Sequence, residues 1–132
     1  MRYMLDTNIC IYLMRLQPPA VAQRFATLQH GDAVMSAITL AELRYGVAAH
    51  PSQSELAERA LQALVEDIPV LPFDDRAAMS YGVLRAAVRE RQRNALDRLI
   101  AAHAVAHGLT LVTNNEADFT VYPGLKVENW VG

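Results

Sequence analysis

Four acidic residues are spaced so that their side chains could gather at one site. Each of them follows an apolar run or lies in the first turn of an expected helix; they are Asp6, Glu42, Asp97 and Asp118. Such positions meet at the carboxyl end of a parallel sheet when the crossovers are regular and right-handed. Carboxylates placed together repel one another, so the cluster is stable only with protons or a cation between them.

The chemistry indicated by this cluster is metal-assisted hydrolysis of a phosphodiester. All-oxygen, anionic sites favour hard divalent ions, here Mg²⁺ or Mn²⁺, which leave room for water and for a substrate phosphate. Such an ion polarises a phosphoryl oxygen and lowers the pKa of a bound water.

Each acid taken alone also has a structural explanation. Glu42 could complete a capping box that begins at Thr39, and Asp97 could complete the equivalent box with Asn94. The other two acids could be cap or turn residues. The coincidence of four acids at equivalent topological positions favours the metal site.

Five short apolar runs are expected to form strands. No β-hairpin signal joins any two of them, which favours parallel over antiparallel pairing. Two prolines in the third run favour an edge position for that strand. The expected strands cover residues 3–5, 33–37, 68–73, 109–113 and 125–127.

Helical patterns separate these strands. Thr7 or Asn8 could cap the first helix, and Pro18 and Pro19 end it. The alternation predicts a single domain over residues 1–132, an α/β/α sandwich with a short central parallel sheet between two helical layers. The expected helices cover 9–17, 21–28, 39–49, 55–66, a long segment that begins at 74–75, and 95–107, with a turn or short helix at 114–119.

The composition is that of an ordinary folded protein, with 52% hydrophobic and 20% charged residues. No apolar run approaches the roughly 20 residues that a membrane span needs, and the start does not resemble a signal peptide. The one cysteine, Cys10, cannot form an internal disulfide, which fits a reducing cytoplasm. We therefore expect a cytoplasmic protein without membrane contact.

The basic residues are distributed unevenly. The net charge of −2 gives no global sign of nucleic-acid binding, but eleven of the twelve basic residues are arginines. An arginine cluster is often a solvated helix face, although the planar guanidinium also suits phosphate. Arg85 belongs to this cluster, and the candidates for RNA contact are Arg89, Arg91, Arg93 and Arg98.

Four motifs cover nearly the whole chain in order. They are MLDTNICIYL at residues 4–13, SAITLAELRYG at 36–46, LDRLIAAHA at 96–104, and LVTNNEADF at 111–119 followed by PGLKVENW. Together they resemble the motifs of the PIN-domain ribonucleases and, among these, of the VapC toxins of bacterial toxin–antitoxin pairs.

The resemblance implies an Mg²⁺- or Mn²⁺-dependent endoribonuclease. It further implies a homodimer and a cognate VapB-like antitoxin whose tail covers the active site. Toxins that share the first motif are similar to enzymes that cut the anticodon stem-loop of initiator tRNA. By resemblance the metal ligands are Asp6, Glu42 and Asp97, the fourth acid is Asp118, often linked to the metal through water, and the supporting residues are Thr7, Asn8 and Asn114.

One segment departs from the family pattern. Many relatives carry a glycine-rich PIG sequence before the third acid, whereas residues 91–96 read RQRNAL here. We expect a shorter loop in which Arg91 and Arg93 contact RNA. For the dimer and the antitoxin, we expect exposed apolar surface around Ile11, Leu13, Leu43 and Tyr45, unless the core takes these residues.

Three other readings are open from the sequence. His103 and His107 have the i, i+4 spacing of a zinc hydrolase, but Ala104 replaces the glutamate and both lie on an apolar stripe, which favours a core role. A receiver-like signalling module needs an acidic pair after the first strand and a lysine after the last. The chain offers only Asp6 at the first position, and Lys126 comes before the end of the last expected strand. A non-catalytic PIN-like interaction domain is disfavoured by the presence of all four acids.

Overall fold

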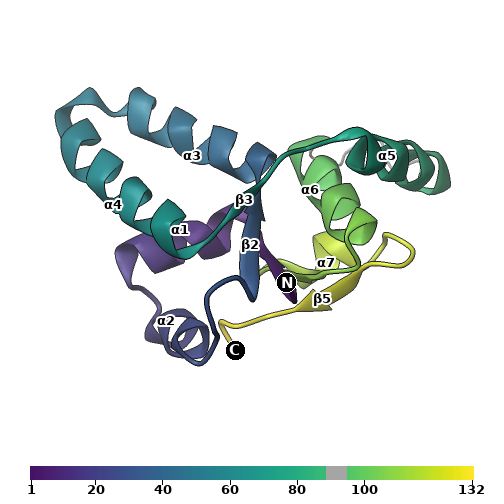
Figure 1. Cartoon of the computed structure of the whole chain (residues 1–132), viewed down its shortest axis with the longest axis horizontal. Helices are drawn as coiled ribbons and strands as arrows, with labels where there is room; N and C mark the ends of the chain where they lie inside the picture. Colours follow the sequence, from purple (N-terminus) through teal and green to yellow (C-terminus); the bar gives the residue numbers. More distant parts are fainter. Residues whose placement is uncertain (89–94) are drawn as a thin grey trace.

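A five-stranded parallel sheet lies at the centre of the computed structural model, which describes residues 1–88 and 95–132. Helices cover both faces of the sheet, as Figure 1 shows. This confirms the predicted α/β/α sandwich, and the third strand lies at an edge as its prolines indicate. The strand order is β3 (Val70–Leu71), β2 (Ala33–Ser36), β1 (Tyr3–Leu5), β4 (Thr110–Val112) and β5 (Lys126–Glu128).

The central strand β1 is buried on both faces. Tyr3 and Leu5 pack into one hydrophobic core, and Met4 packs into the other, because successive side chains of a strand point to opposite faces. Met4 pairs with Val34 of β2 and with Leu111 of β4. Burying each such side chain contributes about 1.5–3 kcal/mol to the stability, which explains why this strand reads as an uninterrupted apolar run.

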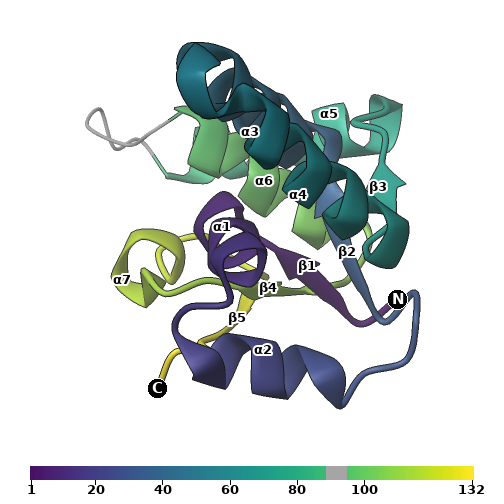
Figure 2. The same cartoon turned by 90° about the vertical axis from the view of Figure 1, so that its left-hand side faces the viewer.

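The helices form two layers. Figures 1 and 2 show α3 and α4 side by side, as a pair that extends away from the sheet. No helix in the two described ranges is long and apolar enough to cross a membrane. One core contains side chains of α1 (Thr7–Arg15), α2 (Pro19–Ala26), α3 (Ala37–Ala49) and α4 (Ser54–Asp67), with the short 3₁₀ helix η1 (Pro51–Gln53) between α3 and α4; the other contains side chains of α5 (Asp75–Ala87), α6 (Ala95–Ala106) and α7 (Glu116–Phe119).

Two predicted helix caps are wrong. The first helix begins at Thr7, and its cap is Asp6, whose carboxylate accepts the backbone N–H of Ile9 at 2.9 Å. The helix after β2 begins at Ala37 instead of following a cap at Thr39, because the Ser36 hydroxyl accepts an N–H of its first turn. In both cases the last polar residue at the strand end caps the next helix, so the helix starts earlier than its apolar pattern indicates.

Candidate active site

Asp6 lies at the carboxyl end of the central strand. Its backbone N–H donates to the carbonyl of Val112 in β4 at 3.0 Å, and its carboxylate caps α1. Only 6% of the residue is exposed. The backbone of Asp6 is therefore fixed by β4, and its side chain is held at the start of α1.

Burial raises the pKa of Asp6 above its usual range. The negative charge of Glu42 raises it further, whereas hydrogen bonds from the Thr113 side chain and from the backbone of Ile9 and Asn8 oppose the rise. The protein thus keeps a carboxylate in a position that disfavours its charge. A nearby cation would remove much of this penalty.

Glu42 is tied to the start of α1. The Thr7 hydroxyl donates to Oε1 of Glu42 at 2.5 Å and lies 3.4 Å from the hydroxyl of Thr39. Glu42 therefore makes no capping box with Thr39, and its bond to Thr7 joins the helix after β1 to the helix after β2. The structure places Thr7 where it can orient a carboxylate beside Asp6.

Asp97 lies in the first turn of α6 and is half-buried. Burial, followed by repulsion from Asp6, Glu42 and Asp118, raises the pKa of Asp97 to about 6. Because repulsion weakens with distance, these contributions indicate that the three other carboxylates lie in the same region as Asp97. The structure therefore brings the four predicted acids to the same end of the sheet.

The segment after β4 carries Asp118 in the short helix α7. Its carboxylate accepts a hydrogen bond from the Asn115 amide at 2.5 Å. Asn114 donates from its amide to the Tyr12 hydroxyl on α1 at 2.9 Å. Asn8 is exposed, and its backbone N–H donates to the Asp6 carboxylate.

The chemistry of these donors fits a hard divalent ion. All four groups are carboxylates, and burial and mutual repulsion raise the pKa of Asp6 and Asp97 in the absence of a cation. Among residues 1–88 and 95–132, no group of three or more His, Cys, Asp or Glu side chains is arranged to hold a metal ion as it stands. The acids are thus of the right type and in the right region, but their side chains would have to close around an ion.

The predicted RNA-contacting arginines fall into two groups. Arg89, Arg91 and Arg93 lie outside the described residues. Arg98 lies in α6 directly after Asp97, and only 9% of it is exposed. Contact of Arg98 with RNA stays a prediction, and this burial leaves little of its side chain open to a ligand.

Of the two histidines, His103 in α6 has the core role that the apolar stripe indicates, whereas His107, directly after α6, is half-buried. His103 is fully buried, and its Nδ1 lies 2.7 Å from the Ser36 hydroxyl. Its ring packs edge-on against Phe73 at 5.2 Å between centroids and lies 5.3 Å from the ring of His107. Phe73 and Ser36 give the ring packing and hydrogen-bond partners of a core histidine.

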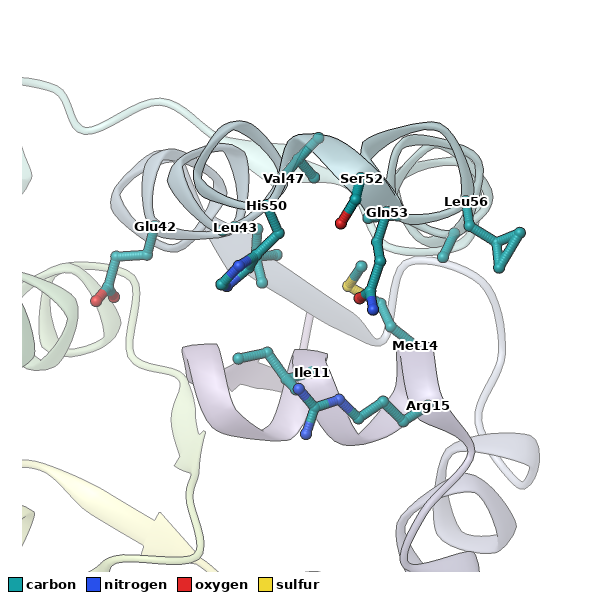
Figure 3. A pocket seen from close by; sticks show the side chains of 13 residues that line it. Ile11, Met14, Arg15, Glu42, Leu43, Val47, His50, Ser52, Gln53 and Leu56 are labelled. Atoms are coloured by element: carbon teal, nitrogen blue, oxygen red, sulfur yellow. The ribbon is translucent and has the colours of Figure 1, made fainter.

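A groove between α1 and the α3–α4 pair begins at the acidic site. It has a volume of about 870 Å³, and Glu42 lies at one end of it (Figure 3). Figure 3 also shows Ile11, Arg15 and Leu56 along the groove. Its lining is mostly apolar, so it could accept an apolar segment that leads to Glu42.

The expectation of exposed apolar residues is only partly confirmed. Tyr45 is 74% exposed and Ile11 is half-buried in the groove wall. Leu13 and Leu43 belong to the core, although Leu43 also contributes to the groove. The core takes these two because they lie on the faces of α1 and α3 that pack against other elements.

Three residues with clear roles at the site have no signal of their own in the sequence. Thr113 hydrogen-bonds to Asp6, Tyr12 accepts from Asn114, and Ser36 joins α3 to α6. The only available hint for Thr113 is its position directly after an apolar strand. The other two contacts join residues 102 and 67 positions apart, so local patterns do not reveal them.

Residues 3–125 match the PIN domain family. The chain is 38% identical over 135 residues to a protein of Shigella flexneri named tRNA(fMet)-specific endonuclease VapC, with 98% of each chain covered. It is 35% identical over 133 residues to Ribonuclease VapC2 of Rickettsia felis, again with 98% of each covered.

Solved structures give the same result for the fold. A chain of VapBC2 from Rickettsia felis, bound to a DNA fragment from its promoter, superposes with a TM-score of 0.90 at 34% identity, covering 98% of this chain and 99% of that one. A chain of VapBC-1 from nontypeable Haemophilus influenzae gives a TM-score of 0.86 at 35% identity, with both chains covered completely.

Proposed function

This chain belongs to the PIN-domain family and, within it, to the VapC toxins, and on that premise we propose that it is a metal-dependent endoribonuclease. Family membership makes it a ribonuclease toxin of a toxin–antitoxin system. The proposal adds the metal, its ligands and the substrate. The ligands are Asp6, Glu42 and Asp97, Asp118 is the fourth acid, and the ion is Mg²⁺ or Mn²⁺.

The observation that carries the metal proposal is the placement of four carboxylates at the carboxyl end of the sheet, where burial and the three other acids raise the pKa of Asp97 to about 6. Four carboxylates held in this way at neutral pH are unfavourable unless a cation is bound. When bound, the ion would polarise the scissile phosphate and lower the pKa of a water molecule.

The chain's own residues position the acids for this role. The Thr113 side chain and the α1 backbone hold Asp6. Thr7 holds Glu42, and Asn115 holds Asp118. These hydrogen bonds fix carboxylate orientations before a metal binds, which lowers the cost of forming the site.

We further propose that the substrate is a tRNA anticodon stem-loop, with initiator tRNA as the first candidate. The Shigella flexneri relative, 38% identical, bears the name of a tRNA(fMet)-specific endonuclease, which supports this choice.

Incubation with total bacterial RNA tests both proposals. Purified protein free of antitoxin is incubated with Mg²⁺, with Mn²⁺ or with EDTA, and new 5′ ends are mapped by sequencing. Asp6→Asn is the matched control, because asparagine also caps helices and so preserves the start of α1. We expect metal-dependent cuts in one tRNA loop from the wild type alone. Equal cutting in EDTA would refute the metal, and cuts spread over unrelated RNAs would refute the substrate.

We propose that a VapB-like antitoxin inhibits the enzyme from the groove of Figure 3. The similar structures from Rickettsia felis and Haemophilus influenzae are of VapBC proteins, which supports such a partner. Because the groove leads to Glu42, a bound segment would end at the acids. Dimerisation of the toxin stays a prediction, which analytical ultracentrifugation would check.

A further inference from the structure

A buried hydrogen bond joins the helices that carry two of the acids. The Ser36 hydroxyl and Nδ1 of His103 are 2.7 Å apart, and both residues are fully buried. Ser36 is also the cap of α3, since its hydroxyl accepts the N–H of Ile38 at 3.0 Å. One hydroxyl therefore links the start of α3 to the last turn of α6.

Glu42 and Asp97 lie the same number of residues away from the two partners of this hydrogen bond. Glu42 follows Ser36 by six residues on α3, and Asp97 precedes His103 by six residues on α6. Six residues of helix correspond to roughly 9 Å along the axis. Any change in the crossing of α3 and α6 near Ser36 would therefore change the distance between Glu42 and Asp97.

The surroundings make the bond a rigid one. Phe73 and His107 pack against the imidazole. Burial lowers the pKa of His103, so the ring is neutral at pH 7 and bonds to the hydroxyl without a buried charge. Losing either partner would leave a buried polar group without its bond, which is costly.

We propose that His103 is a positioning residue: through Ser36 it fixes the spacing of α3 and α6, and thereby the separation of Glu42 and Asp97. This rests on the proposed metal site. His103 itself touches neither metal nor substrate. Its role is to hold two carboxylates at a separation that one ion can bridge.

The affinity for Mn²⁺ distinguishes a positioning role of His103 from a role in core packing alone. The dissociation constant is measured by isothermal titration on the full chain without antitoxin, for the wild type, His103→Leu and His103→Asn. The asparagine amide can reach the Nδ1 position and keep the bond to Ser36, whereas leucine fills space without it. Thermal unfolding of the same samples shows that each is folded.

We expect His103→Leu to weaken Mn²⁺ binding by about tenfold or more, the usual effect of removing a group that orients a metal ligand. His103→Asn should stay within about threefold of the wild type, although both variants lower the melting temperature. If His103→Leu does not fold, Ser36→Ala, a smaller change, should give the same loss of affinity.

Two results would overturn the inference. One is an unchanged dissociation constant in folded His103→Leu or Ser36→Ala; the other is equal weakening by leucine and asparagine, which would assign the effect to packing. A wild type that binds no Mn²⁺ would instead refute the metal site itself, and this inference with it.

Discussion

The acidic end of the sheet, formed by Asp6, Glu42, Asp97 and Asp118, and the groove beside it differ in the kind of ligand that would stabilise them. At the acidic end, buried and half-buried carboxylates repel one another, and the pKa of Asp97 is raised to about 6. In the groove, apolar side chains such as Leu56, which is 70% exposed, face solvent. The first region calls for a cation and the second for an apolar partner. Glu42 belongs to both, so a partner in the groove and a metal at the acids meet at one side chain.

Removing one charge from the acidic end should have the largest effect. Asp6→Asn keeps the helix cap but removes a proposed metal ligand, so we expect RNA cleavage to fall by at least about 100-fold, as when a preorganised electrostatic group is lost. Initial rates on one tRNA substrate at saturating Mg²⁺ provide the measurement. Near wild-type rates in the folded variant would show that the acidic end is not the catalytic region.

Charging the groove should impair partner binding instead. Leu56→Glu places a carboxylate on the apolar lining, and we expect it to weaken binding of the cognate antitoxin by about 10- to 100-fold. Met79→Glu is the matched control, because Met79 is equally exposed but lies on α5. Surface plasmon resonance gives both affinities. The same loss in both variants, or none in Leu56→Glu, would remove the groove from the interface.

Removing the hydrogen bond that joins Glu42 to α1 should lower the cleavage rate by less than the loss of Asp6 does. Thr7→Val keeps the side-chain size but removes the hydroxyl that donates to Glu42, and we expect cleavage to fall by about tenfold. Thr27→Val is the control, because that hydroxyl donates to the carbonyl of Arg24 at the end of α2. Single-turnover rates compare them. Similar rates for all three proteins would mean that Glu42 needs no such support.

The smallest effect concerns stability without metal. Folding raises the pKa of Asp97 from 3.8 to about 6, so the folded state binds a proton more tightly, and this group's contribution to stability falls as the pH rises through that range. Asp97→Asn should therefore be more stable than the wild type at pH 7 in EDTA by about 1 kcal/mol. This figure is smaller than the full free-energy equivalent of the pKa shift, because Asp97 is partly exposed and solvent screens its charge.

Urea unfolding at pH 4.5 and pH 7 checks this prediction. The advantage of Asp97→Asn should shrink at the lower pH, where the folded wild type holds the proton, and it should vanish on adding Mg²⁺. An advantage that is independent of both pH and Mg²⁺ would contradict the electrostatic explanation.

The sequence predicts the acidic end better than the groove for a physical reason. Asp6 follows a strand that is apolar on both faces, so the strand, its end and the acid are all visible in one short run. Parallel topology then places the other acids nearby. The groove depends on how α1 packs against α3 and α4, which no single segment specifies.

The helix starts show where local patterns fail. Thr39 and Glu42 match a capping box, yet Ser36 caps α3 and Glu42 bonds to Thr7. A capping motif competes with every other partner that folding brings close, and here a residue 35 positions away takes the carboxylate. The contact between Ser36 and His103 likewise joins residues 67 positions apart, so no local pattern indicates it.

A crystal soaked in Mn²⁺ would test the central claim most directly, through the anomalous signal of the metal. The account predicts a peak in contact with the carboxylates of Asp6, Glu42 and Asp97, with their side chains closed around it. No peak among these acids at millimolar Mn²⁺, in crystals whose groove and acidic end are open to solvent, would contradict it.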